Sequence, residues 1–157
     1  MRALLGLGLF VIIAAGSTAS AFGSSVLVIQ VKSVQTFARV VHNQPPSALS
    51  KGDVLLQRDN LFNITPQLGK TAGALIGKDR ATISLISQTK ATVAGTTSFP
   101  GGTVRFRGTV SFTSTHPAAL RIVGGTGRYA RATGTVTEPA TDSDPHNARN
   151  TYRLKLR

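Results

Sequence analysis

Apolar and polar residues alternate along most of the chain, which is the pattern of β-strands that bury one face. The clearest case is the segment 103–113. Its apolar face carries Val104, Phe106, Val110 and Phe112, and its other face carries threonine, serine and arginine. No segment repeats its apolar residues with the period of a helix. The pattern therefore predicts an all-β fold.

The alternating segments are short and are separated by short turns. They cover residues 25–31, 34–41, 54–61, 72–76, 81–86, 89–99, 103–113, 120–123, 133–137 and 152–156, where 34–41 is either a separate strand or the continuation of the first. Residues 77–79 are expected to form a turn or a bulge. Many short strands favour a single eight-stranded antiparallel β-barrel, because closure removes exposed strand edges. We expect this domain to span residues 22–157.

A glycine cluster at Gly124, Gly125 and Gly127 organises the end of the chain. Glycine adopts positive φ without a steric penalty, so the cluster predicts a tight turn between two strands. A dinucleotide-binding loop would need the spacing G-x-G-x-x-G at the start of a helix. Ala130 breaks that spacing and strand-like sequence follows, so we interpret the cluster as a structural turn. Pro100 followed by glycine predicts a type II turn.

Residues 1–21 have the three parts of a secretory signal peptide. Arg2 is the charged start, residues 4–15 form the apolar centre, and Ala19-Ser20-Ala21 is a cleavage site of small residues. The apolar run is shorter than the roughly 20 residues that span a bilayer. We expect cleavage after Ala21, a secreted or periplasmic protein, and no membrane attachment of the mature chain. An uncleaved anchor is the alternative.

The chain is strongly basic, with 18 lysines and arginines, 6 acidic residues and a formal net charge of +12. This charge fits either an anionic partner or a basic surface that is simply solvated. A nucleic-acid-binding protein normally gathers its basic residues on one face, whereas here they are scattered. We therefore expect no nucleic-acid partner. An envelope or matrix protein that binds an anionic polymer remains the alternative function.

Metal and cofactor sites are not predicted. The chain has no cysteine, which excludes disulfides and thiolate metal sites. His42, His116 and His146 lie in separate expected loops without paired ligand spacing, so we expect no metal and no cofactor. Asn63-Ile64-Thr65 is a glycosylation sequon on an expected loop.

Three motifs follow one another in the chain: GDVLLQRDNLFN at 52–63, GKTAGALIG at 69–77 and VGGTGRYARATG at 123–134. Their order and spacing resemble the allene oxide cyclase and dirigent superfamily. The third motif is similar to the dirigent variant V-V-G-G-T-G-x-[FY]-x-x-A-R-G. The resemblance covers residues 53–156, most of the chain.

This resemblance implies an eight-stranded antiparallel barrel of lipocalin-like shape. Such relatives hold a hydrophobic ligand in the barrel and steer a reactive intermediate to one ring closure or coupling. The resemblance therefore implies a small hydrophobic ligand, a steered cyclisation or coupling, and a homotrimer or homodimer. It leaves open whether this chain is an isomerase-like or dirigent-like enzyme, because the plant catalytic residues are not matched. The expected first strand, 25–31, has no glutamate, and Arg128 stands where dirigent proteins often carry an aspartate.

Asp59 is the candidate catalytic residue and a candidate ligand-binding residue. It stands where the resemblance places a cyclase asparagine that helps to hold a water at the epoxide. A carboxyl that points into a barrel lumen is desolvated, which raises its pKa and makes it a proton donor. A salt bridge with Arg58 or simple exposure is the alternative. Tyr129 is the second candidate ligand-binding residue, and it either lines the mouth of the barrel or packs as a cap.

Overall fold

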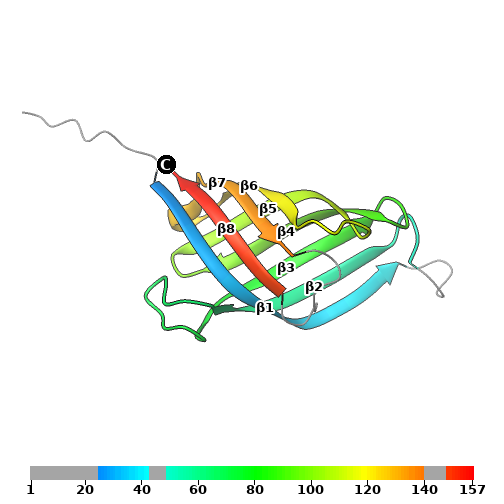
Figure 1. Ribbon diagram of the computed structural model, residues 1–157. Helices are drawn as coiled ribbons and strands as arrows, with labels where there is room; N and C mark the ends of the chain where they lie inside the picture. The colour runs from blue at the N-terminus through cyan, green and yellow to red at the C-terminus, as the bar shows by residue number, and fades with distance from the viewer. Residues whose placement is uncertain (1–24, 43–48, 140–147) are drawn as a thin grey trace, which may run out of the picture.

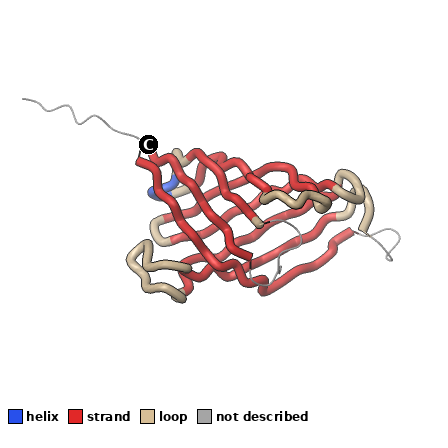
Figure 2. Tube along the Cα trace, viewed as in Figure 1, coloured by secondary structure: helices blue, strands red, loops and turns tan. Residues whose placement is uncertain are grey.

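The computed structural model describes residues 25–42, 49–139 and 148–157. Within these ranges eight strands close into one antiparallel barrel (Figure 1). The strands are β1 (Ser25–His42), β2 (Val54–Asn63), β3 (Leu75–Leu85), β4 (Lys90–Phe99), β5 (Gly102–Ser111), β6 (Ala118–Gly125), β7 (Thr133–Glu138) and β8 (Ala148–Leu156). A short 3-10 helix, η1 (Gly127–Tyr129), is the one helical element of the described residues (Figure 2). The predicted eight-stranded barrel is confirmed.

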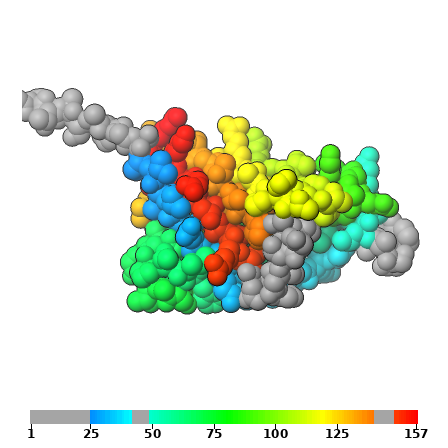
Figure 3. All heavy atoms as spheres, viewed as in Figure 1, coloured from blue at the N-terminus to red at the C-terminus, as the bar shows by residue number. Residues whose placement is uncertain are grey.

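Each strand pairs with the strand that follows it, and β8 pairs with β1 to close the sheet. All eight pairings are antiparallel. The space-filling view shows β1, β8 and β7 side by side along the wall (Figure 3). Because none of the described strands is left at an edge, backbone hydrogen bonds continue around the whole wall.

The first strand is 18 residues long, which confirms that residues 34–41 continue it. Its part from Ser25 to Ser33 pairs with β8, and its part from Val31 to His42 pairs with β2. Two register shifts interrupt the pairing with β2, and such irregularities bend a strand. Figure 1 shows β1 sweeping from the side of β8 to the far end of the barrel.

The glycine turn after β6 forms where the sequence predicts it. Gly124 and Gly127 have φ values of +114° and +56°, in the region that glycine enters without a penalty. A Cβ on Gly127 would overlap the carbonyl oxygen of Gly101, and the same carbonyl accepts a 2.9 Å hydrogen bond from the Arg128 backbone N–H. The turn is thereby held against the β4–β5 turn, where the φ of Gly101, +91°, agrees with the expected type II geometry.

One end of the barrel interior, next to this turn, is filled by apolar side chains. Its members include Phe99, Val104, Phe106, Ile122 and Tyr129, which are each at most 6% exposed. The ring of Phe99 lies edge-on to Tyr129, with 6.3 Å between centroids. We call the region of these five residues the packed end.

The structure tests two expectations for the loops. Residues 77–79 were expected to form a turn or a bulge: they form no turn and belong to β3, and a bulge-like register shift interrupts the β2–β3 ladder between Leu75 and Gly77. Asn63 is not on a loop: it ends β2, is 3% exposed, and its amide nitrogen donates to the carbonyls of Gln67, Lys70 and Thr71 at 3.1–3.2 Å. The sequon asparagine therefore holds the β2–β3 loop together instead of facing solvent.

The predicted signal peptide, residues 1–21, and His146 lie outside the described residues. Where the chain is described, it has no helix of the length and apolar character that crossing a membrane requires.

Candidate functional site

A cavity of about 330 Å³ lies inside the barrel, beyond the packed end. Its apolar wall includes Leu55, Ala81, Ile83, Val93, Val110 and Phe112. Its polar lining includes Ser33, Gln57, Asp59, Asp79, Glu138 and Asn150. The cavity therefore combines apolar sides with a concentrated polar patch.

Three carboxyl groups reach the cavity from three different strands. Asp59 lies on β2, Asp79 lies opposite it on β3, and Glu138 ends β7. Asp59 and Asp79 are 7% and 6% exposed, and Glu138 is half-buried. Side chains alternate along a strand, so Asp79 faces inward with Leu85, and Glu138 faces inward with Val136.

The Asp59 carboxylate is held by neighbours on β1 and β2. The hydroxyl of Ser33 donates to Asp59 Oδ2 at 2.8 Å. The amide nitrogen of Gln57 donates to both carboxylate oxygens, at 3.1 and 3.0 Å. These bonds fix the orientation of the carboxylate and occupy the two nearest side-chain donors.

Asp79 ends a chain of hydroxyl groups that crosses the interior. Thr97 Oγ1 donates to Asp79 Oδ1 at 3.0 Å, and the Thr97 hydroxyl lies 3.0 Å from the hydroxyl of Tyr152. A threonine hydroxyl has a single proton, so Tyr152 is the donor to Thr97 when Thr97 donates to Asp79. Burial raises the pKa of Tyr152 well above its ordinary value, which keeps this proton in place.

Burial also raises the pKa of two of the cavity carboxyls so far that they are partly protonated near neutral pH. Desolvation is the main cause that raises the pKa of Asp79 to about 7, and the negative charges of Asp59 and Glu138 raise it further against the opposing hydrogen bond from Thr97. Desolvation followed by the charge of Asp59 raises the pKa of Glu138 to about 7. Like charges in a low-dielectric site resist ionising together, so the cavity holds exchangeable protons at physiological pH.

One buried acceptor in the cavity wall has no partner. Asn150, on β8, is 5% exposed, and its Oδ1 accepts no hydrogen bond from the described residues. A buried acceptor left unpaired destabilises a protein by about 1–3 kcal/mol, so a ligand that donates to it would gain that interaction. In the described part of the chain, metal-binding side chains are not grouped in threes or more.

A family model described as Dirigent-like protein matches residues 28–157. The chain belongs to this dirigent-like family. The family assignment made from the three motifs is thereby confirmed.

Solved structures share the fold of this dirigent-like protein. Pyocyanin demethylase is 19% identical with a TM-score of 0.63, over 83% of this chain and 100% of its own. AbnU, an exo-specific intermolecular Diels-Alderase, is 12% identical with a TM-score of 0.67, over 84% of this chain and 98% of its own. The pterocarpan synthase dirigent protein PsPTS1 is 22% identical with a TM-score of 0.60, over 86% and 95%. A comparison with curated proteins found no match. At these identities the likeness concerns the barrel and not its chemistry.

The two residues singled out from the sequence lie in different parts of the dirigent-like barrel. Asp59 is in the cavity wall, and its catalytic and ligand-binding roles stay predictions. Tyr129 is fully buried in the packed end, where its hydroxyl donates to the carbonyl of Pro100 at 3.1 Å. It is not among the residues that line the cavity. Its geometry is that of a packing residue, and its role toward a ligand stays a prediction.

Sequence reasoning missed Asp79, Glu138 and Asn150. Asp79 falls in the turn or bulge expected at 77–79, and Glu138 follows the strand expected at 133–137, so the pattern assigned neither side chain to a face. The signal was present in the alternation, because Asp79 shares the face of Ala81, Ile83 and Leu85. A polar residue in phase with an apolar face marks an inward-facing position. Thr97 is such a residue, because it shares the face of Val93 and Phe99 on β4.

Proposed function

We propose that this dirigent-like protein is a secreted barrel that binds a small hydrophobic ligand in its cavity and steers a cyclisation or coupling of a reactive intermediate. The observation that carries the proposal is the cavity itself, which sets apolar walls beside carboxyls whose pKa lies near 7. Shared fold with a Diels-Alderase and a pterocarpan synthase dirigent protein supports it. Secretion rests on the signal-peptide pattern of residues 1–21.

The chemistry follows from what the walls and the carboxyls do to a bound molecule. Apolar walls restrict a flexible intermediate to few conformers, which lowers the barrier to one ring closure or coupling geometry. A protonated Asp79 or Glu138 is able to donate a proton to an oxygen that becomes basic during the reaction. The Asp59 carboxylate stabilises positive charge that develops nearby.

A cavity-filling variant tests ligand binding. In the Ala81→Phe variant the new ring occupies the cavity, and in the matched control Ala94→Phe the same ring lies on the exposed face of β4. The wild type and the two variants are titrated with a fatty-acid epoxide, a polyene and a phenol, and thermal unfolding is followed. We expect at least one class to raise the Tm of the wild type and of Ala94→Phe, but not of Ala81→Phe. Equal shifts in all three proteins, or none in any, would refute the proposal.

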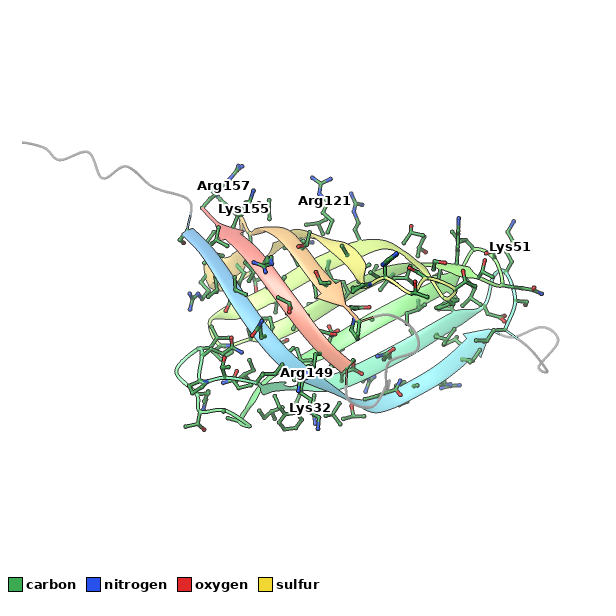
Figure 4. All side chains as sticks on the ribbon, viewed as in Figure 1. Lys32, Lys51, Arg121, Arg149, Lys155 and Arg157 are labelled. Atoms are coloured by element: carbon green, nitrogen blue, oxygen red, sulfur yellow. The ribbon has the colours of Figure 1, made fainter. Side chains whose placement is uncertain are left out.

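The surface charge supports a second candidate function, the binding of an anionic polymer. Every lysine and arginine in the described ranges is exposed, whereas each aspartate and glutamate there is buried or half-buried. Figure 4 shows Lys32, Lys51, Arg121, Arg149, Lys155 and Arg157 projecting outward from the barrel. The outside of the wall is therefore cationic around the whole barrel.

Several of these cations face one another across neighbouring strands. The directly paired residues are Arg58 with Arg80, Arg107 with Arg121, and Lys32 with Arg149. Like charges directly opposite on a sheet destabilise it, and a polyanion that lies over them removes this repulsion. A groove of about 770 Å³ on the outer face of β3, β4 and β5 is bordered by Lys78, Arg80, Arg105 and Arg107.

Heparin chromatography tests this second function. The variant Arg105→Gln/Arg107→Gln removes two charges at the groove, and Arg39→Gln/Arg157→Gln removes two exposed charges elsewhere. A groove site predicts elution at clearly lower salt for the first variant than for the second. Equal elution of both variants would mean that net charge alone retains the protein.

A further inference from the structure

Above about pH 7, once Asp79 and Glu138 have lost their protons, most of the polar groups that the cavity offers to a ligand are hydrogen-bond acceptors. Asp59, Asp79 and Glu138 contribute carboxyl oxygens, and Asn150 contributes an unpaired Oδ1. The donors next to Asp59 are already used, because the Ser33 hydroxyl and the Gln57 amide both point to that carboxylate. Among the described lining residues there is no lysine or arginine.

Asn150 provides a second line of evidence for a bound ligand, and this evidence does not depend on the three carboxyl groups. It is 5% exposed, lines the cavity and leaves its Oδ1 without a donor. Buried acceptors are nearly always paired in folded proteins, so an unpaired one in a cavity wall marks the place for a donor from outside the chain. Neighbouring Ala148 also lines the cavity, so this stretch of β8 faces it with little side-chain bulk.

We propose that the cavity selects a small apolar molecule that carries a protonated amine and rejects the equivalent carboxylate. The inference rests on the proposed ligand-binding function and adds the chemical class of the ligand. An ammonium group is a donor to several oxygens at once and has the charge that the cavity lacks. The apolar sides, which include Ile83, Val93 and Phe112, receive the hydrocarbon part. A carboxylate ligand would bring a fourth carboxyl group into the same space and would be repelled.

The charges around the cavity set the pH dependence of this selection. The titratable groups that face it are Asp59 from β2, Asp79 from β3, Glu138 from β7 and His116 from the β5–β6 loop, with Tyr152 of β8 behind Thr97. Ionisation of Asp79 and Glu138 as the pH rises past 7 increases the attraction for an ammonium group. Amine binding should therefore be stronger at pH 8 than at pH 5, whereas a neutral alcohol should show no comparable gain.

Three ligands of nearly equal shape test the selection: 4-phenylbutylamine, 4-phenylbutan-1-ol and 4-phenylbutyrate. Their dissociation constants are measured by calorimetry at pH 8 on the full chain. We expect the amine to bind about tenfold more tightly than the alcohol, because a charge-assisted hydrogen bond is stronger than a neutral one. We expect 4-phenylbutyrate to bind more weakly than either. Glu138→Gln and, independently, Asn150→Leu should reduce the preference for the amine. Arg39→Gln/Arg157→Gln, which changes only the exterior, should keep it.

The outcomes separate this inference from the function on which it rests. Equal binding of the amine and the alcohol, or binding of 4-phenylbutyrate more tightly than the amine, would overturn the amine selection. The barrel would still be a ligand-binding protein. An amine preference that survives in both cavity variants would also overturn it, because the contact would lie elsewhere. Failure of all three ligands to bind would remove the proposed ligand-binding function itself. If Glu138→Gln does not fold, Asn150→Leu alone decides.

Discussion

The packed end and the cavity end of this barrel follow the same alternation of side chains and differ in what the inward positions carry. The inward residues of β5 run from Val104 and Phe106 at the packed end to Val110 at the cavity, and Phe112, directly after the strand, continues the same face. The first pair is at most 2% exposed, and the second pair is half-buried beside open space. One strand therefore serves as core over half its length and as a binding wall over the rest.

The polar residues separate the two ends in the same way. On β4, Phe99 packs at one end, Thr97 carries the hydroxyl chain at the middle, and Val93 lines the cavity. A substitution at the packed end should thus cost stability, and one at the cavity end should change ionisation and binding. The four predictions below test this division, in order of decreasing effect on stability.

The largest effect is expected for truncation of Phe106. Its ring lies over Gly95, where a Cβ would overlap it, so the ring fills a space shaped for it. Phe106→Ala should lower the free energy of unfolding by about 3–5 kcal/mol, as for other buried phenylalanines. Phe112→Ala is the matched change at the cavity end and should cost clearly less, because Phe112 is half-buried beside an existing cavity. Urea denaturation measures both, and equal losses would contradict the division.

The second prediction concerns the pH dependence that Asp79 imposes. Its pKa is about 7 in the barrel and near 3.8 in the unfolded chain. Between these values the folded state binds more protons than the unfolded state, so stability falls as the pH rises from about 4 to about 7. Asp79→Asn keeps an oxygen for the Thr97 hydroxyl but cannot ionise. It should be more stable than the wild type at pH 8, by about 2–4 kcal/mol, and similar at pH 4.

Thermal unfolding across pH 4–8 measures this difference. The control is Asp59→Asn, whose carboxylate accepts three hydrogen bonds that the amide can only partly replace. A stability gain at pH 8 for Asp79→Asn with a loss for Asp59→Asn would show that the two facing aspartates carry different roles. A flat difference between Asp79→Asn and the wild type at every pH would contradict the prediction.

The sequence predicts the fold well, but it predicts the cavity only in part, and the reason is physical. Strand alternation and the glycine turn are local, so residues such as Val104 and Gly127 reveal their roles within a few positions. The cavity is lined by residues from all eight strands, so its formation depends on how distant parts of the chain come together in the closed barrel. The inward direction of Asp79 was readable from its phase with Leu85. Its burial, which is the main cause of its raised pKa, and its position opposite Asp59, which raises the pKa further, follow from barrel closure and strand register that no local pattern sets.

The third prediction weakens the support of Asp59. Ser33→Ala removes the 2.8 Å hydrogen bond to Oδ2 and leaves the two bonds from Gln57. Hydrogen bonds to charged groups contribute about 1.5–3 kcal/mol, and the remaining donors should bring the loss to the lower end of that range at pH 8. Ser98→Ala, on the exposed face of β4, is the control and should change stability by less than about 0.5 kcal/mol. Equal effects of the two variants would mean that Ser33 does not hold the carboxylate.

The smallest effect is expected where the two ends meet, at Tyr152. Its ring packs edge-on against Phe99, with 5.0 Å between centroids, and its hydroxyl donates toward Thr97 and so toward Asp79. Tyr152→Phe keeps the ring and should cost only about 1 kcal/mol, the net value of one neutral hydrogen bond. It should also shift the pH at which Asp79 titrates, because the threonine hydroxyl is then free to reorient. A double-mutant cycle with Thr97→Val isolates this coupling. Additive losses and an unchanged titration would show that Tyr152 belongs to the packed end alone, so that the hydroxyl chain does not join the core to the cavity.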